Sequence, residues 1–163
     1  MDLNRAFITF GGAGLSPKAP GTVGSFVALI VGLLLLKVLP METFFMLTLT
    51  ITVIGIFEIN KYEAKTGSHD DKSIVIDEVS GMWITLMFAL STAQTLSYPY
   101  LYEIAIVSSF ATFRLFDIWK PSTIGTIDRK VKGGLGVMGD DILAGVAAGL
   151  LTILLLLGLD KIL

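Results

Sequence analysis

Acidic side chains gather where a long uncharged segment begins. Asp77 and Glu78 stand at its start, and His69, Asp70 and Asp71 lie in the polar stretch just before them. Acids at a helix N-terminus gain only about 0.3 to 1 kcal/mol from the helix dipole, too little to explain four carboxylates so close together. Carboxylate oxygens are hard ligands that suit Mg²⁺ or Mn²⁺. A divalent metal site is therefore expected here, whereas His69 is interpreted as a solvated loop residue.

A second group of charges occupies one face of an expected helix. Arg114, Asp117 and Lys120 recur every three residues, and Pro121 ends the helix after them. Taken alone, this spacing is typical of a ladder of intrahelical ion pairs. The alternative is that the helix enters a site, because charges in so apolar a chain are costly unless they face water or protein.

The segment that follows mixes acids, bases and glycines. Asp128 and Arg129 come first, and a glycine-rich run then ends at Asp140 and Asp141, where the last apolar segment starts. Ion pairing does not explain that run. Glycine lets a backbone approach a ligand closely, so either of the paired aspartates can face one.

A third polar segment lies near the N-terminus. Residues 14–25 are mostly turn-forming and open onto an apolar run, with Lys18, Thr22 and Ser25 among them. Backbone amides at a helix N-terminus attract phosphate, and these side chains add hydroxyls and a positive charge. The segment is not a Walker A loop. A capped helix start explains it about equally well when it is taken alone.

The apolar elements that must position these residues predict an all-α integral membrane bundle. The 163 residues are 53% hydrophobic with a mean hydropathy of +0.78, beyond ordinary soluble domains. Uncharged stretches at 23–36, 43–57, 79–102 and 142–159, with a shorter one at 104–113, predict about five transmembrane helices. Residues 1–163 are expected to form one domain, with the first span retained rather than cleaved.

Long polar segments alternate with short ones, so five spans would bring all three charged segments to one face. Most of the lysines and arginines lie in them, which predicts a cytoplasmic position for that face. The net charge of −2 gives no reason to expect a nucleic acid partner. Phosphoryl transfer needs carboxylates for Mg²⁺, cations for phosphate oxygens and a carboxylate that handles the nucleophile, and the three segments contain all of these.

Several other mechanisms are disfavoured by composition. The chain has no cysteine and one histidine, which excludes cysteine nucleophiles and argues against lipid phosphatases that need two histidines. The motif spacings of CDP-alcohol phosphotransferases and of haloacid-dehalogenase phosphatases are missing from the sequence. A small membrane carrier for a metal or other ion is the non-enzyme alternative, although it would place acids within spans rather than at one boundary.

Four segments of the chain resemble the phosphatidylglycerophosphatase A family. They are SPKAPGTVGS at 16–25, IVIDEVSG at 74–81, FRLFDIWKP at 113–121 and GVMGDD at 136–141. The chain departs from the expected pattern after Pro121 and at Asp71 and Lys72, without change at the charged motif positions. The resemblance implies a Mg²⁺-dependent phosphatase of the bacterial cytoplasmic (inner) membrane that converts phosphatidylglycerophosphate to phosphatidylglycerol.

The matching positions come from that resemblance, and the individual roles are inferred for them as hypotheses. Metal ligands are expected among Asp77, Glu78, Asp140 and Asp141, with Asp70 or Asp117 completing the set. The substrate phosphate is expected to contact Lys18, Thr22, Ser25, Arg114, Lys120 and Arg129. Asp128 is the expected general base, with Asp117 and Asp140 as further catalytic carboxylates, and attack by water or by an aspartate remains open.

Overall fold

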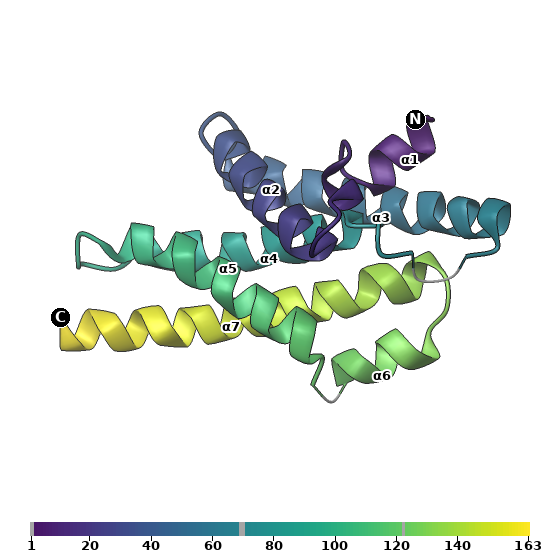
Figure 1. Ribbon diagram of the computed structural model, residues 1–163. Helices are drawn as coiled ribbons and strands as arrows, with labels where there is room; N and C mark the ends of the chain where they lie inside the picture. The colour runs from purple at the N-terminus through teal and green to yellow at the C-terminus, as the bar shows by residue number, and fades with distance from the viewer. Residues whose placement is uncertain (1, 69–70, 122) are drawn as a thin grey trace.

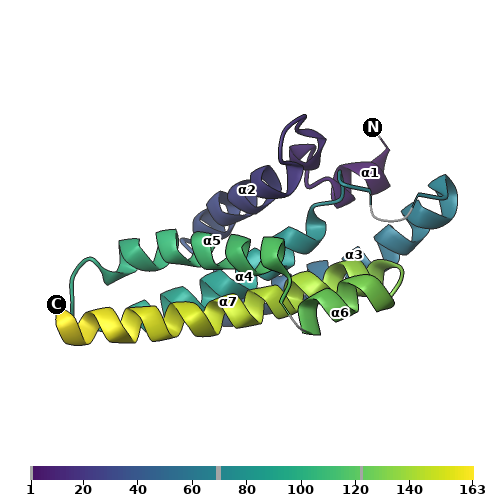
Figure 2. The ribbon, with the colours of Figure 1, turned by 60° about the horizontal axis from the view of Figure 1, so that its bottom comes forward.

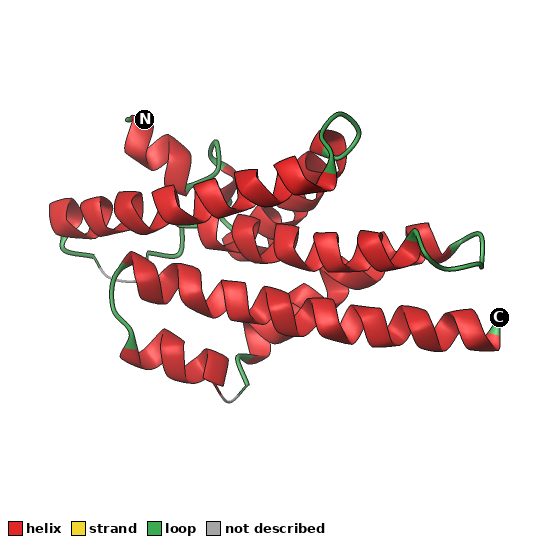
Figure 3. Cartoon of the chain, turned by 180° about the vertical axis from the view of Figure 1, so that it is seen from behind, coloured by secondary structure: helices red, strands yellow, loops and turns green. Residues whose placement is uncertain are grey.

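The computed structural model describes residues 2–68, 71–121 and 123–163, with side chains for all of these except Thr123, Asp128 and Arg129. The described residues form helices and connecting loops, and no strand occurs among them (Figure 3). The all-helical expectation is therefore confirmed. The elements are α1 (Leu3–Ile8), a 3₁₀ turn η1 (Ala13–Leu15), α2 (Pro20–Leu35), α3 (Met41–Thr66), α4 (Ile76–Ala93), α5 (Leu101–Trp119), α6 (Thr123–Lys130) and α7 (Gly134–Ile162) (Figure 1).

A long helix lies in each of the five expected apolar segments, namely α2, α3, α4, α5 and α7, although α4 ends at Ala93, before the end of the uncharged stretch 79–102. Their ends follow local sequence signals. Pro20 begins α2, where its missing N–H costs no hydrogen bond. Gly67 ends α3 in the left-handed conformation, and Lys120 ends α5 in the same conformation just before Pro121. The short helices α1 and α6 lie within polar segments where no helix was expected.

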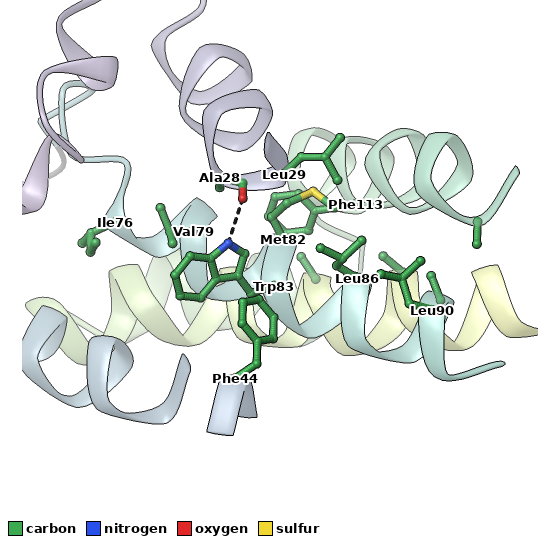
Figure 4. Packing of buried hydrophobic residues seen from close by; sticks show 14 of the residues in the cluster. Ala28, Leu29, Phe44, Ile76, Val79, Met82, Trp83, Leu86, Leu90 and Phe113 are labelled. Atoms are coloured by element: carbon green, nitrogen blue, oxygen red, sulfur yellow. Dashed lines mark hydrogen bonds between the residues drawn. The ribbon is translucent and has the colours of Figure 1, made fainter. Parts of the chain in front are cut away.

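Helix α4 is the centre of the bundle. It packs against α2, α3, α5 and α7, and most of its residues are buried. Trp83 fills the space between three helices: its ring lies 4.9 Å from that of Phe44 in α3, and its indole N–H donates a 2.8 Å hydrogen bond to the carbonyl of Ala28 in α2 (Figure 4). This contact fixes α2 and α3 against the middle of α4.

In the part of the chain that the structure describes, two helices, α3 and α7, are long and apolar enough to cross a membrane by length and composition. Only 22% of the apolar window of α3 and 33% of that of α7 are buried inside the molecule. A core helix of a soluble protein would be mostly buried, so these two helices present their apolar side chains outward. Phe45, Leu49 and Leu154 are examples of the exposed apolar side chains.

The polar connections gather away from the C-terminus. Figures 1 and 2 show the loop between α3 and α4, and the segment from the end of α5 through α6 to α7, on the half of the molecule opposite Leu163. The short connection between α4 and α5 lies at the other end, near the C-terminus. The charged segments singled out in the sequence therefore come from helix ends that share one side of the bundle.

Candidate active site

A cavity of about 290 Å³ opens at this polar side. It is formed where the beginnings of α2, α4 and α7 meet the end of α5 and the loop before α4. Its lining includes five acidic and three basic side chains: Asp71, Asp77, Glu78, Asp117 and Asp141, with Lys72, Arg114 and Lys120. Residues from all three charged segments of the sequence thus contribute to one cavity, although, among the described residues, the N-terminal segment 14–25 contributes only Pro20 and Gly21.

Three of the acids form a compact cluster. One carboxylate oxygen each from Asp77, Glu78 and Asp141 lie within 4.8 Å of one another. Glu78 is 9% exposed and Asp141 only 3%. Each of the three also has a buried oxygen that receives no hydrogen bond from the described residues. Ionised carboxylates that are buried and converge repel one another, and a cation between them would remove this repulsion, so this donor set fits a hard divalent ion.

Close packing of α4 against α7 brings the cluster together. A Cβ atom on Gly81 would lie 2.5 Å from the carbonyl oxygen of Asp141, and one on Gly145 would lie 2.4 Å from that of Gly81. Thr85 strengthens the crossing, because its hydroxyl lies 3.0 Å from the carbonyl oxygens of both Gly81 and Gly145. Only glycine permits this approach, which sets the carboxylates of α4 beside Asp141.

Arg114 is held in place from two sides. It is ion-paired with Asp117, one turn further along α5, and its Nη1 donates a 3.2 Å hydrogen bond to the hydroxyl of Ser25 in α2. That hydroxyl is fully buried and donates in turn to the carbonyl of Gly21 at 2.8 Å. The Nε of Arg114 is buried and bonds no group in the described part of the chain. The guanidinium is therefore positioned at the cavity with donor capacity left over.

Lys120 and Asp140 form a second pair across the site. The Lys120 ammonium lies 2.5 Å from a carboxylate oxygen of Asp140, whose side chain is 5% exposed. Lys120 lines the cavity and follows α5, whereas Asp140 belongs to α7 beside Asp141. The two neighbouring aspartates thus differ in surroundings: Asp141 joins the acidic cluster, and Asp140 contacts a cation.

The predicted site residues divide accordingly. The structure brings together Asp77, Glu78, Asp117, Asp140, Asp141, Arg114 and Lys120. Ser25 contacts Arg114 rather than lining the cavity, while Thr22 does not line it and Lys18 is exposed outside it. Asp70 and the side chains of Asp128 and Arg129 lie outside the described residues, so their roles stay predictions.

Asp71 and Lys72 line the cavity although neither was among the expected site residues. Asp71 accepts a 2.7 Å hydrogen bond from the hydroxyl of Tyr62 in α3 and another, 2.9 Å long, from the backbone N–H of Ser73. The Tyr62 hydroxyl, followed by the Ser73 N–H, lowers the pKa of the Asp71 carboxyl below its ordinary value. The signal in the sequence was the adjacent pair Asp70-Asp71, but only Asp70 was predicted to be a metal ligand.

The glycine run before Asp140 packs against protein rather than opening space for a ligand. A Cβ atom on Gly134 would lie 2.2 Å from the carbonyl oxygen of Ile56 in α3. The backbone N–H of Gly134 also donates a 2.8 Å hydrogen bond to the side-chain oxygen of Asn60. Close contact with α3 therefore explains this glycine and fixes the start of α7, which carries the aspartate pair.

Comparisons with known proteins point to one family. The model of the family described as phosphatidylglycerophosphatase A matches residues 6–156. A protein of that name from Escherichia coli K12 is 42% identical over 141 residues, covering 86% of this chain and 76% of that protein. Its namesake from Haemophilus influenzae is 39% identical over 84% of this chain and 78% of that protein.

A third relative differs in name. It is a Bacteroides thetaiotaomicron protein, provisionally named a phosphatidylinositol-3-phosphatase, and is 37% identical over 83% of this chain and 82% of its own length. No solved structure matches the chain. The family match covers nearly all the described helices and includes every acidic and basic residue that lines the cavity. The chain therefore belongs to the phosphatidylglycerophosphatase A family.

Proposed function

We propose that the chain removes the terminal phosphate of phosphatidylglycerophosphate, giving phosphatidylglycerol and inorganic phosphate. The observation that carries the proposal is the meeting of a buried carboxylate cluster with Arg114 and Lys120 in one cavity, in a chain of the phosphatidylglycerophosphatase A family. Family membership supports a lipid phosphatase and gives no support to the alternative of an ion carrier.

A divalent cation, for which we propose Mg²⁺, completes the cavity. Acids outnumber bases in the lining, so a phosphate dianion would meet net negative charge if it entered alone. Asp77, Glu78 and Asp141 would hold the ion, with Asp70 as a proposed additional ligand. Bound there, a divalent cation would neutralise phosphate charge and polarise its oxygens.

The basic side chains are the proposed phosphate ligands. Arg114 lies at the cavity with its guanidinium fixed by Asp117 and Ser25 and with its Nε unpaired among the described residues. A fixed guanidinium can bind two phosphate oxygens without losing further side-chain entropy. Lys120 contributes a point charge, and Asp140 keeps it at the cavity.

The remaining expected residues keep their proposed roles. Arg129 is proposed to contact the phosphate, and Asp128 to be the general base. Lys18 and Thr22 do not line the cavity, so they are proposed to contact the substrate only on its approach. Asp117 and Asp140 are supported in a positioning role by their contacts with Arg114 and Lys120. The nucleophile is either an activated water or an aspartate that becomes phosphorylated. Only the second mechanism gives a phosphorylated chain that can be trapped during turnover and detected by mass spectrometry.

The bilayer is the proposed location. We propose that α2, α3, α4, α5 and α7 span the bacterial cytoplasmic membrane as one multi-pass domain, with the cavity facing the cytoplasm. Outward-facing apolar side chains on α3 and α7 support spanning, and the lysines and arginines on the cavity side support its orientation. The acyl chains of the substrate could then stay in the bilayer while its phosphate enters the cavity.

The test is phosphate release from phosphatidylglycerophosphate in mixed detergent micelles. We expect release with Mg²⁺, none with EDTA, and a loss of at least about a hundredfold in kcat for Glu78→Gln, a size typical of a removed electrostatic contact to the reacting group. Glu103→Gln is the matched control, because Glu103 is exposed at the opposite end of α5. Full activity of Glu78→Gln, or no release by the unaltered chain, would contradict the proposal.

A further inference from the structure

One apolar side chain on the rim of the polar cavity is mostly exposed. Ile118 lines the cavity together with its neighbours Asp117 and Lys120, yet it is 71% exposed. Ile74, another apolar residue of the lining, is only 5% exposed. Ile74 is therefore part of the core, whereas Ile118 is free to contact whatever enters the cavity from outside.

Ile118 also begins an apolar line along the outer face of α5. Leu115, Ala111 and Val107 follow it at intervals of three or four residues, so the four lie on one face of the helix. All four are exposed. From Ile118 to Val107 the helix rises about 16 Å, which equals roughly half the 30 Å hydrocarbon thickness of a bilayer. The line therefore has the length of one lipid leaflet.

We propose that Ile118 is a specificity-determining residue that contacts the glycerol backbone and first acyl carbons of the lipid substrate, and that the line Ile118–Leu115–Ala111–Val107 holds one acyl chain. The proposal rests on the proposed function. Its basis is continuity: the same side chain borders the cavity that would bind the phosphate and the exposed face that would meet the chain. The phosphate and the acyl chain belong to one lipid molecule. When the phosphate is bound in the cavity, the acyl chain must therefore run outward over an apolar surface that begins at the rim of the cavity.

Trp119 provides the comparison that separates this role from ordinary contact with the bilayer. It is the next residue of α5 and is 68% exposed, but it does not line the cavity. If exposed apolar residues on α5 merely contact bulk lipid, changes at the two positions should have the same effect. If Ile118 contacts the substrate, only its replacement should weaken substrate binding.

The experiment compares Ile118→Ser, Trp119→Ser and Ile118→Leu in mixed micelles that contain dioleoyl phosphatidylglycerophosphate. We expect KM to rise about tenfold for Ile118→Ser with kcat unchanged, since an interaction that is equal in bound substrate and transition state affects KM alone. Trp119→Ser and Ile118→Leu should retain the KM of the unaltered chain. Inhibition by inorganic phosphate should be the same for all variants, which shows that the cavity is intact.

A second substrate separates this inference from the proposed function. Glycerophosphoglycerophosphate carries the same headgroup without acyl chains, so Ile118→Ser should hydrolyse it as the unaltered chain does, or both should fail to hydrolyse it. Equal KM values for the lipid in Ile118→Ser and the unaltered chain would overturn the role of Ile118, as would an equal rise in Trp119→Ser. Absence of lipid hydrolysis in the unaltered chain would instead refute the proposed function.

Discussion

Replacement of Gly81 by alanine should separate the acidic cluster without removing a carboxylate. The new Cβ would lie 2.5 Å from the carbonyl oxygen of Asp141 and 2.4 Å from a ring carbon of Phe113. Carbon and oxygen atoms essentially never approach within 3.0 Å in this way, so α4 and α7 must part by at least about 0.5 Å. Backbone atoms form one side of the contact, so a change of rotamer cannot relieve it.

Two magnitudes follow from that displacement. Overpacking of a tight contact costs typically about 1 to 3 kcal/mol of stability. Active sites must be held to within about 0.5 Å, and a misplacement of about 1 Å can reduce a rate about a hundredfold. We therefore expect Gly81→Ala to remain folded in detergent with a lowered midpoint of thermal unfolding, and to lose about tenfold to a hundredfold in kcat.

The assay is phosphate release in mixed micelles alongside thermal unfolding followed by circular dichroism. Gly158→Ala is the matched control, because Gly158 lies in α7 with nothing within 4 Å of its added Cβ. That change should leave activity unaltered and should not lower the unfolding midpoint, since alanine favours helix more than glycine does. Gly81→Ala with the unaltered kcat and unfolding midpoint would show that the helix crossing does not position the cluster.

Four further substitutions test other parts of the site. Asp141→Asn should abolish stabilisation by Mg²⁺, which would reach about 2.7 kcal/mol at a hundredfold excess over Kd in the unaltered chain, as measured by thermal unfolding with and without the ion. Ser25→Ala removes one of the two groups that hold Arg114 and should raise KM several-fold. Arg114→Lys should raise KM more, because lysine cannot replace the two-pronged contact of the guanidinium. Equal KM values for Ser25→Ala and the unaltered chain would contradict the role of Ser25 in positioning Arg114. The pKa of the Asp71 carboxyl is lowered in the folded chain, so the ionised carboxylate stabilises the fold above the ordinary carboxyl pKa, and this stabilisation is lost as the pH falls through the lowered pKa. Tyr62→Phe removes the hydrogen bond that contributes most to this lowering. In unfolding measurements from pH 6 to about pH 3, Tyr62→Phe should therefore lose less stability on acidification than the unaltered chain does.

The sequence alone indicated the long helices and most of the charged residues that meet at the cavity. Long uncharged runs, with Pro121 after the fourth of the long helices, predicted where the long helices lie, because apolar segments of that length leave few other conformations. Helix α3 nevertheless continues to Thr66, beyond the uncharged run that ends at Phe57. Asp77, Glu78 and the pair at 140–141 stood out because carboxylates at the edge of an apolar segment are costly without a partner. The family resemblance carried by these segments is confirmed by the comparisons.

Tertiary structure decided which of those residues meet. Asp140 and Asp141 are neighbours in the chain, yet one contacts Lys120 and the other joins Glu78, because successive residues of a helix point about 100° apart and α4 covers only one of those directions. Ser25 was expected at the phosphate but supports Arg114, since the crossing of α2 and α5 turns its hydroxyl toward that side chain. Such assignments depend on the rotation and separation of packed helices, which the glycine contacts set and which no local pattern encodes.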